Sequence, residues 1–232
     1  MPRLFLFPVP LADVAPAEVL PAPNLEIIKQ VKYFAVENLR SARRFLRAVS
    51  PDIVIDDLDL RELSEHTDVA EVEALIAPMD AGHDMGIISE AGCPAVADPG
   101  ADLVAAAQRR GYTVVPLVGP SSILMALMAS GFNGQCFTFR GYLPREGKAR
   151  NAAMRQMERD VRRGDTQIFI ETPYRNNRII EELCHALPGN MLLCVASDIT
   201  GPRQSIMTRP LSHWASMKYD YSKIPTIFLL YS

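Results

Sequence analysis

Small, flexible residues and two acidic side chains are concentrated in one stretch, Gly86–Gly100. Ile87 and Ile88 predict the end of a buried strand, and an apolar helix is expected to begin near Asp102. A loop of Gly, Ala and Pro at the carboxyl end of a strand lets a ligand reach the backbone, and the helix that follows offers unpaired N–H groups. The same residues also occur in ordinary turns. Taken alone, the stretch leaves a ligand site and a plain turn as open alternatives.

The four cysteines do not indicate a metal centre or a disulfide framework. Cys93, Cys136, Cys184 and Cys194 are widely spaced, with no C-x-x-C pair and no cluster among the four His residues. Structural zinc sites use closely spaced Cys and His, and small disulfide-rich folds contain many cysteines in a short chain. We therefore expect reduced, mostly buried thiols and no metal.

Length and composition are those of a soluble globular protein. The chain has 232 residues, of which 48% are hydrophobic and 22% charged, enough for one large or two modest domains. The apolar run Arg3–Phe7 is too short for a signal peptide or a membrane span, and Pro8 and Pro10 follow it directly. These features predict a cytoplasmic protein without a membrane segment.

Strand and helix patterns alternate along the first half of the chain. The segments expected to be strands are Arg3–Phe7, Tyr33–Val36, a possible short one at Ile53–Ile55, the run ending at Ile88, and Tyr112–Val115. Asn24 is expected to cap a helix that continues to Val31, and later helices are expected at Ser41–Val49 and Asp68–Pro78. This order predicts an α/β fold in which helices cover both faces of a parallel sheet.

The second half begins with a marked loop, Pro116–Ser122, and an apolar helix that Gly131 is expected to close. Ser121 and Ser122 can cap this helix, or donate to a bound carboxylate or ribose, and both alternatives remain open. Further strands are expected to start at Phe137 and to end near Ile170, Ala196 and Tyr231.

Charge is unevenly distributed along the sequence. Residues 51–80 carry ten acidic side chains against the single Arg61, whereas residues 140–163 carry eight basic side chains against three acidic ones. The helix at Ser41–Val49 adds several arginines, expected on mixed faces. Such runs are commonly solvated surfaces, but a basic run is also what a nucleic-acid ligand requires.

Four blocks of the chain resemble, in order, the motifs of the tetrapyrrole methylase superfamily. They are Gly86–Gly100, Pro116–Gly131, Phe137–Arg150 and Phe169–Arg175. The first contains SEAGCPAVADPG, which is similar to the signature SDAGTPxxSDPG. The match is to the branch that methylates the ribose 2′-hydroxyl of small-subunit ribosomal RNA.

The resemblance implies two α/β domains, 1–115 and 116–232, with S-adenosylmethionine in the cleft between them, and a homodimer. The cofactor-binding residues that it implies are Leu11, Gly92, Cys93, Pro94, Ala95, Val96, Asp98, Ser121, Ser122, Glu171, Thr172 and Thr226. Cys93 is expected to line the pocket and not to act as a nucleophile, because the sequence shows no basic neighbour that would lower its pKa.

Methyl transfer from a sulfonium needs mainly alignment and desolvation of the reactants. A ribose hydroxyl can also need a base, and Glu37, Asp98 and Glu171 are the candidates. Each of the three carboxylates can instead cap a helix or orient the cofactor. The residues expected to contact the RNA or ribosomal subunit are Arg40, Arg145, Lys148, Arg150 and Arg175.

Departures from the family motifs keep two other functions open. Ala12–Val14 replaces the family's Gly-Asn-Leu, and Ser197 and Gly201 stand where it has Arg and Lys. One alternative is methylation of a tetrapyrrole-like or other small acceptor. The other is a homologue that binds cofactor or RNA without turnover. The basic block can equally face the acidic segment across a domain or dimer contact.

Overall fold

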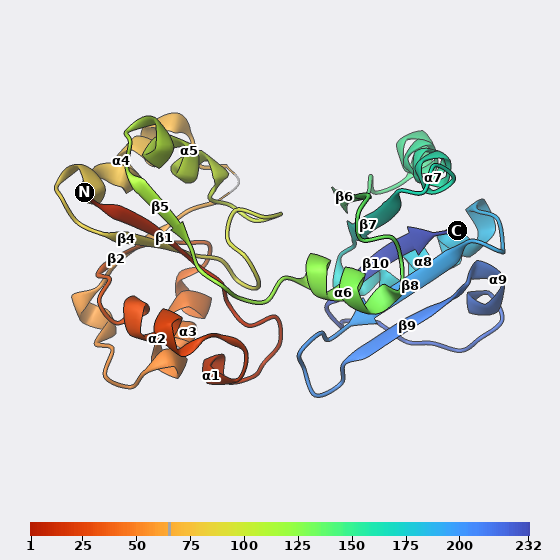
Figure 1. Ribbon diagram of the computed structural model, residues 1–232, viewed down its shortest axis with the longest axis horizontal. Helices are drawn as coiled ribbons and strands as arrows, with labels where there is room; N and C mark the ends of the chain where they lie inside the picture. Colours follow the sequence, from red (N-terminus) through yellow and green to blue (C-terminus); the bar gives the residue numbers. More distant parts are fainter. Residues whose placement is uncertain (65) are drawn as a thin grey trace. The chain divides into compact units, whose positions relative to one another are not determined.

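The computed structural model describes residues 1–64 and 66–232 (Figure 1). The chain forms two compact units, Met1–Ser121 and Ser122–Ser232. The segment that follows the predicted boundary at residue 116 thus belongs to the first unit as far as Ser121. Glu65, part of the predicted acidic segment, lies outside the described residues.

The first unit is built on a five-stranded sheet in which every pairing is parallel. Its strands, in chain order, are β1 (Arg3–Phe7), β2 (Tyr33–Val36), β3 (Asp59–Glu62), β4 (Met85–Ile88) and β5 (Thr113–Pro116). In space they lie in the order β3-β2-β4-β1-β5. The parallel sheet predicted from the alternating pattern is confirmed.

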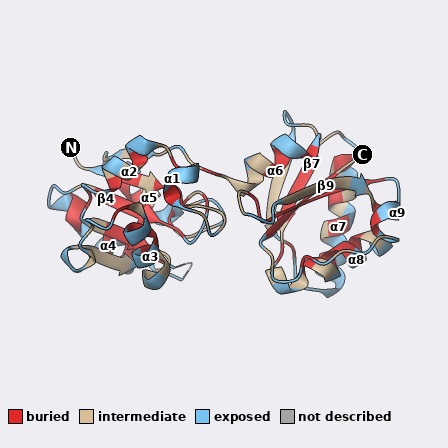
Figure 2. Cartoon of the chain, turned by 90° about the horizontal axis from the view of Figure 1, so that it is seen from below, coloured by how far each residue is buried: buried red, intermediate tan, exposed pale blue. Residues whose placement is uncertain are grey.

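Helices cover both faces of this sheet (Figures 1 and 2). They are α1 (Pro16–Val19), α2 (Ala22–Ile28), α3 (Leu39–Val49), α4 (Val69–Asp80) and α5 (Ala101–Arg109), with a 3₁₀ turn, η1, at Ile55–Asp57. One apolar cluster joins α4 and α5 to one face, and a second joins α1, α2 and α3 to the other. Loops therefore occupy the carboxyl edge of the sheet, and this edge is where such sheets bind ligands.

Two local predictions in this unit are wrong. Asn24 does not cap α2, which begins after Pro21. Its side chain is buried, and its Nδ2 donates to the Val118 carbonyl at 2.7 Å. The possible strand at Ile53–Ile55 is replaced by the turn η1 and by β3, an edge strand that is half-buried from Asp59 to Arg61 and exposed at Glu62. An edge strand with charged side chains gives no apolar run to detect.

The second unit contains a mixed sheet in the order β6-β7-β10-β8-β9. Its strands are β6 (Phe137–Tyr142), β7 (Thr166–Ile170), β8 (Leu192–Ser197), β9 (Ser205–Pro210) and β10 (Thr226–Tyr231). Its helices are α6 (Ser122–Ser130), α7 (Gly147–Val161), α8 (Asn176–Ala186) and α9 (Leu211–Trp214), with a 3₁₀ turn, η2, at Pro173–Arg175. Only β6 and β7 pair in parallel, and Gly131 closes α6 with a φ of 79°, as predicted.

The core of the second unit lies between its sheet and helices α7, α8 and α9 (Figure 2). Phe169 of β7 and Phe228 of β10 stack at a centroid distance of 5.5 Å. Trp214 is fully buried, and its Nε1 donates to the Leu193 carbonyl at 3.0 Å. Burial of each large apolar side chain contributes roughly 1.5–3 kcal/mol. None of the helices formed by residues 1–64 and 66–232 combines the length and apolar character that a membrane crossing requires.

The central strand β4 depends on a glycine. A Cβ on Gly86 would lie 2.7 Å from the Phe34 ring and 2.8 Å from the Phe7 ring. We expect Gly86→Ala to lower the free energy of unfolding by about 1–3 kcal/mol, because overpacking displaces core side chains. Urea unfolding followed by circular dichroism measures this change. Gly134→Ala is the control, since no atom lies within 4 Å of its Cβ position. Equal midpoints for the two variants would contradict the prediction.

Candidate functional site

The loop Ser89–Gly100 leaves β4 at the carboxyl edge of the parallel sheet. An isolated antiparallel bridge joins it to the segment after β1: Val9 N donates to the Gly92 carbonyl and Gly92 N donates to the Val9 carbonyl, both at 2.9 Å. Gly92 has a φ of +72°, and a Cβ there would lie 3.2 Å from Leu11 Cδ2. Gly92 therefore brings bare backbone against Leu11 in a conformation that other residues avoid.

Two alanines in this loop also have left-handed backbones. Ala95 has a φ of 64° and Ala97 a φ of 61°, and Gly100 at 132° leads into α5. A residue with a Cβ in this region costs roughly 1–2 kcal/mol, so such conformations persist only where the surrounding structure holds them. Strained backbone of this kind clusters at ligand-binding sites. The geometry gives the sequence prediction of a ligand loop its first structural support.

Cys93 joins the loop to the segment before α6. Its Sγ donates to the Pro120 carbonyl at 3.5 Å. Burial raises the pKa of the Cys93 thiol above its ordinary value, and the charge of Asp98 raises that pKa further. The group is therefore a neutral thiol, which is a poor nucleophile.

Glu37 and Glu90 hold the start of the loop. The Glu37 amide continues the sheet by donating to the Ile88 carbonyl at 3.1 Å, and Glu37 Oε2 accepts from the Glu90 amide at 2.9 Å. Ser41 Oγ of α3 donates to Glu90 Oε1 at 2.8 Å. The carboxyl end of β2, the first turn of α3 and the loop are thus connected by hydrogen bonds.

Ser89 was not singled out from the sequence. Its side chain is buried, and its Oγ has no hydrogen-bond partner within residues 1–64 and 66–232. An unsatisfied buried hydroxyl costs about 1–3 kcal/mol, so a ligand oxygen or nitrogen here would be favoured. The signal in the sequence was its place as the first residue of the SEAGCP motif, directly after the strand.

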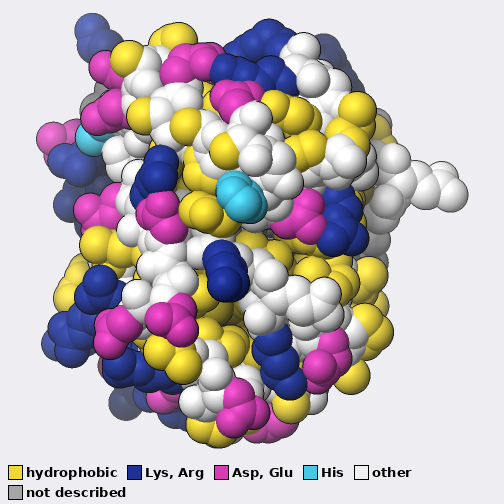
Figure 3. All heavy atoms as spheres, turned by 90° about the vertical axis from the view of Figure 1, so that its left-hand side faces the viewer, with side chains coloured by type: hydrophobic (Ala, Val, Ile, Leu, Met, Phe, Trp, Pro, Cys, Tyr) yellow, Lys and Arg dark blue, Asp and Glu magenta, His cyan; other side chains and the backbone are white. Residues whose placement is uncertain are grey.

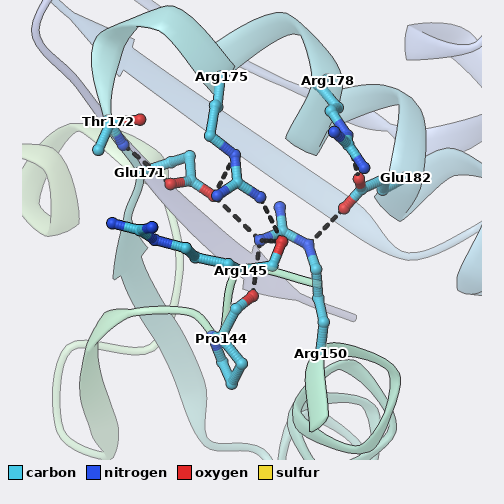
Figure 4. A network of polar contacts seen from close by, with 8 residues as sticks. All are labelled: Pro144, Arg145, Arg150, Glu171, Thr172, Arg175, Arg178 and Glu182. Carbon is cyan, nitrogen blue, oxygen red and sulfur yellow. Dashed lines mark hydrogen bonds and ion pairs between the residues drawn. The ribbon is translucent and has the colours of Figure 1, made fainter. Parts of the chain in front are cut away.

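Arg150 is the centre of a buried ionic network in the second unit (Figure 4). Only 3% of its side chain is exposed, and 4% of that of Glu171. Arg150 Nη1 donates to Glu171 Oε2 at 3.0 Å and to the Pro144 carbonyl at 2.8 Å, and its Nε pairs with Glu182. The prediction that Arg150 contacts RNA is corrected, because its charge is committed to two carboxylates inside the unit.

Glu171 has its oxygens engaged in the same network. Its Oε1 accepts from the Thr172 amide at 2.9 Å, and Arg175 Nε lies 3.8 Å from its Oε2 (Figure 4). Arg175 also donates to the Arg145 carbonyl. The carboxylate therefore orients the segments that follow β6 and β7, a role consistent with its deep burial.

The remaining candidates are distributed over both units. Arg40 is exposed in the first turn of α3, and Arg145 and Lys148 are exposed before and within the first turn of α7. Ser121 and Ser122 are half-buried, Thr172 is exposed, and Thr226 is buried with its Oγ1 donating to the Ile224 carbonyl at 2.9 Å. Within the part of the chain that the structure describes, no group of His, Cys, Asp and Glu could hold a metal ion.

The sequence matches a known protein family, and the fold is similar to that of a solved structure. Residues 18–215 match the family model described as Tetrapyrrole (Corrin/Porphyrin) Methylases. A solved structure, the methyltransferase CobJ, superposes with a TM-score of 0.65 over 99% of this chain and 93% of that chain, at 15% sequence identity. At that identity the likeness shows the fold.

Curated relatives are similar over most of the chain. Ribosomal RNA small subunit methyltransferase I of Vibrio cholerae is 28% identical over 211 residues, which cover 91% of this chain and 69% of the relative. The protein of the same name from Mycobacterium tuberculosis is 30% identical over 213 residues, which cover 92% of this chain and 72% of the relative.

The two-unit α/β fold and these matches define a methyltransferase. Within that class the chain belongs to the tetrapyrrole (corrin/porphyrin) methylase family, the superfamily to which its motifs pointed.

The buried position of Arg150 generates a stability prediction. We expect Arg150→Met to lower the free energy of unfolding by about 3–5 kcal/mol, because it leaves Glu171 with reduced compensation in the core. Arg145→Met, at an exposed site, should change it by less than about 0.5 kcal/mol. Adding Glu171→Gln to Arg150→Met should recover part of the loss, since the uncompensated charge is removed. A tolerated Arg150→Met with impaired RNA binding would instead support the original sequence prediction.

Proposed function

We propose that this methyltransferase transfers the methyl group of S-adenosylmethionine to a ribose 2′-hydroxyl of small-subunit ribosomal RNA. The observation that carries the proposal is the Ser89–Gly100 loop, with bare backbone at Gly92 and left-handed alanines at the carboxyl edge of a parallel sheet. The names of the similar Vibrio and Mycobacterium proteins support the choice of substrate.

The residues of the first unit fit this cofactor. Gly92, Ala95 and Ala97 have little or no side-chain bulk, so an adenosyl group can approach the loop backbone. Leu11 offers an apolar contact, and the buried Ser89 hydroxyl offers an unsatisfied hydrogen-bond group. The neutral Cys93 thiol would not attack the electrophilic methyl group. When bound, the cofactor supplies a methyl group on a sulfonium leaving group.

The proposed binding residues extend beyond these. In the first unit they include Pro94, Val96, Asp98 and Ser121. The second-unit residues Ser122, Glu171, Thr172 and Thr226 are proposed on the family motifs. Glu171 would act by orienting its segment, because Arg150 and the Thr172 amide occupy its carboxylate.

Glu37 and Asp98 are the proposed bases for the ribose hydroxyl. Both are half-buried, Glu37 at the carboxyl end of β2 and Asp98 within the loop. In that position a carboxylate can take the hydroxyl proton as the oxygen attacks the methyl group. Glu171, which the sequence ranked with them, is the weakest of the three because its negative charge is balanced inside the core.

RNA contacts are proposed for Arg40, Arg145, Lys148 and Arg175. The first three are exposed, whereas Arg175 is half-buried beside Glu171. These cations would bind phosphates of the polyanionic acceptor, while the bound cofactor supplies the methyl group. A cytoplasmic homodimer is the setting that the family motifs suggest.

A tetrapyrrole-like acceptor is the second candidate, and the turn after β8 favours it. A Cβ on Gly201 would overlap the Asp198 carboxylate, so a lysine at this position would force the turn to rearrange. Asp198 and Thr200 have positive φ values of 48° and 70°. The cation that the ribosomal RNA branch places here is therefore replaced by a tight turn around a carboxylate.

Tritiated S-adenosylmethionine distinguishes the two acceptors. We expect label to enter the RNA of small ribosomal subunits isolated from cells that lack the enzyme. The phosphodiester bond after the labelled nucleotide should resist alkaline hydrolysis, since a 2′-O-methyl group blocks the attacking hydroxyl. Labelling of a precorrin-type macrocycle but not of RNA would select the second candidate. Binding of cofactor without label in any acceptor would indicate a homologue that has lost turnover.

Gly92→Val tests the cofactor loop directly. We expect it to weaken S-adenosylhomocysteine binding in calorimetry by at least about tenfold, equivalent to about 1.4 kcal/mol. A side chain at φ +72° strains the loop and displaces Leu11. Gly111→Val is a matched control, because Gly111 has a φ of +73° and no atom within 4 Å of its Cβ position. Equal binding of S-adenosylhomocysteine by both variants would exclude this loop as the cofactor site.

A further inference from the structure

Helix α3 presents four arginines on one face. Arg40, Arg43, Arg44 and Arg47 follow the spacing i, i+3, i+4, i+7, and all four are exposed. The buried side chains of the helix, Ala42, Phe45 and Leu46, lie on the opposite face. The expectation that these arginines occupy mixed faces is therefore wrong. Here we call the four residues the α3 arginine stripe.

The stripe carries positive charge that no carboxylate neutralises within residues 1–64 and 66–232. None of its guanidinium groups forms an ion pair there. Two of its pairs, Arg40 with Arg44 and Arg43 with Arg47, are like charges one turn apart, an arrangement that destabilises a helix. An anionic partner would relieve this repulsion.

The basic run of the second unit, residues 140–163, differs because several of its cations form ion pairs. On α7 and just after it, Arg162 pairs with Glu158 at 2.6 Å and Arg163 lies 3.9 Å from Asp160. Arg140 pairs with the same Asp160, and Arg159 donates to Gln156. Four of the eight cations between residues 140 and 163 thus have a carboxylate partner within the unit, namely Arg140, Arg150, Arg162 and Arg163. All four cations of the α3 arginine stripe lack such a partner in the part of the chain that the structure describes.

The stripe begins at the candidate site. Asn38 caps α3 by accepting from Arg40 N at 2.9 Å and Ser41 N at 3.1 Å. Ser41 Oγ then contacts Glu90 of the cofactor loop at 2.8 Å. From Arg40 to Arg47 the helix rises roughly 10 Å. Figure 3 shows that basic side chains occur at several places on the face of the first unit that it presents, with acidic side chains among them.

We propose that the α3 arginine stripe binds the phosphate backbone of the RNA strand that carries the methylated ribose. The inference rests on the proposed function and adds an RNA surface on the first unit. Charge complementarity and the hydrogen-bonded connection from Ser41 to the loop favour an RNA strand as the occupant. Arg40 would contact the phosphate nearest the reacting ribose, and Arg43, Arg44 and Arg47 would contact its neighbours.

The test is the salt dependence of RNA binding by a triple variant, Arg43→Gln, Arg44→Gln and Arg47→Gln. The probe is a transcript of small-subunit ribosomal RNA. Each lost phosphate contact lowers the log–log slope by roughly 0.7–0.9, so the triple variant should lose about two units. We expect its KM for RNA to rise at least about tenfold, with kcat at saturating RNA and binding of S-adenosylhomocysteine unchanged.

Two further variants test whether the change in slope comes from the charge of the α3 arginine stripe. Replacing the same three arginines by lysine should retain most of the slope, because the charges are kept. The variant Arg155→Gln, Arg159→Gln and Arg162→Gln removes the same charge from α7 and its C-cap, and should change the slope by less than about one unit.

A wild-type slope in the α3 triple glutamine variant, with methylation of RNA intact, would overturn the inference and leave the proposed function standing. Loss of a dimer in that variant, with RNA binding unchanged, would also overturn it and make the stripe a protein contact. Failure of the wild-type protein to bind or methylate RNA would remove the proposed function itself, and with it this inference.

Discussion

The antiparallel bridge between Val9 and Gly92 is the constraint on which the candidate site depends. Strands β1 and β4 are parallel neighbours, and Phe7 pairs with Ile88 where they end. The bridge requires the chain after β4 to turn back so that Gly92 meets Val9 in the opposite direction. A residue with φ near +72° makes this reversal possible, and glycine adopts it without steric cost. Loss of the bridge would break two backbone hydrogen bonds and would release the loop that follows Gly92.

The same constraint explains why the loop is poor in large side chains. With Gly92 pinned against Leu11, the next turns must pass through left-handed conformations at Ala95 and Ala97 before Gly100 leads into α5. Residues with β-branched or bulky side chains adopt this backbone conformation still more rarely than alanine does. The result is a stretch of small side chains at the sheet edge where a doubly wound fold binds its ligands. The site is therefore a consequence of how β1 and β4 end.

The sequence predicted the fold because apolar runs and helical periodicity are local signals. It predicted the loop because Gly, Ala and Pro after a strand leave a compositional pattern. It could not predict β3, an edge strand of charged residues, or the role of Asn24, whose hydrogen bond reaches a residue 94 positions away. Nor could it distinguish Arg150 from Lys148, two residues earlier. One is buried between Glu171 and Glu182 and the other is exposed, a difference that only tertiary packing decides.

The Ser89–Gly100 loop is the proposed binding site of S-adenosylmethionine. Hydrogen exchange of backbone amides, compared with and without saturating S-adenosylhomocysteine, tests it most directly. Slower exchange at the amides between Gly92 and Gly100, with exchange in the distant helix α9 unchanged, is the predicted result. Undiminished exchange throughout this loop, under conditions where calorimetry shows the ligand bound, would contradict the claim and place the cofactor elsewhere.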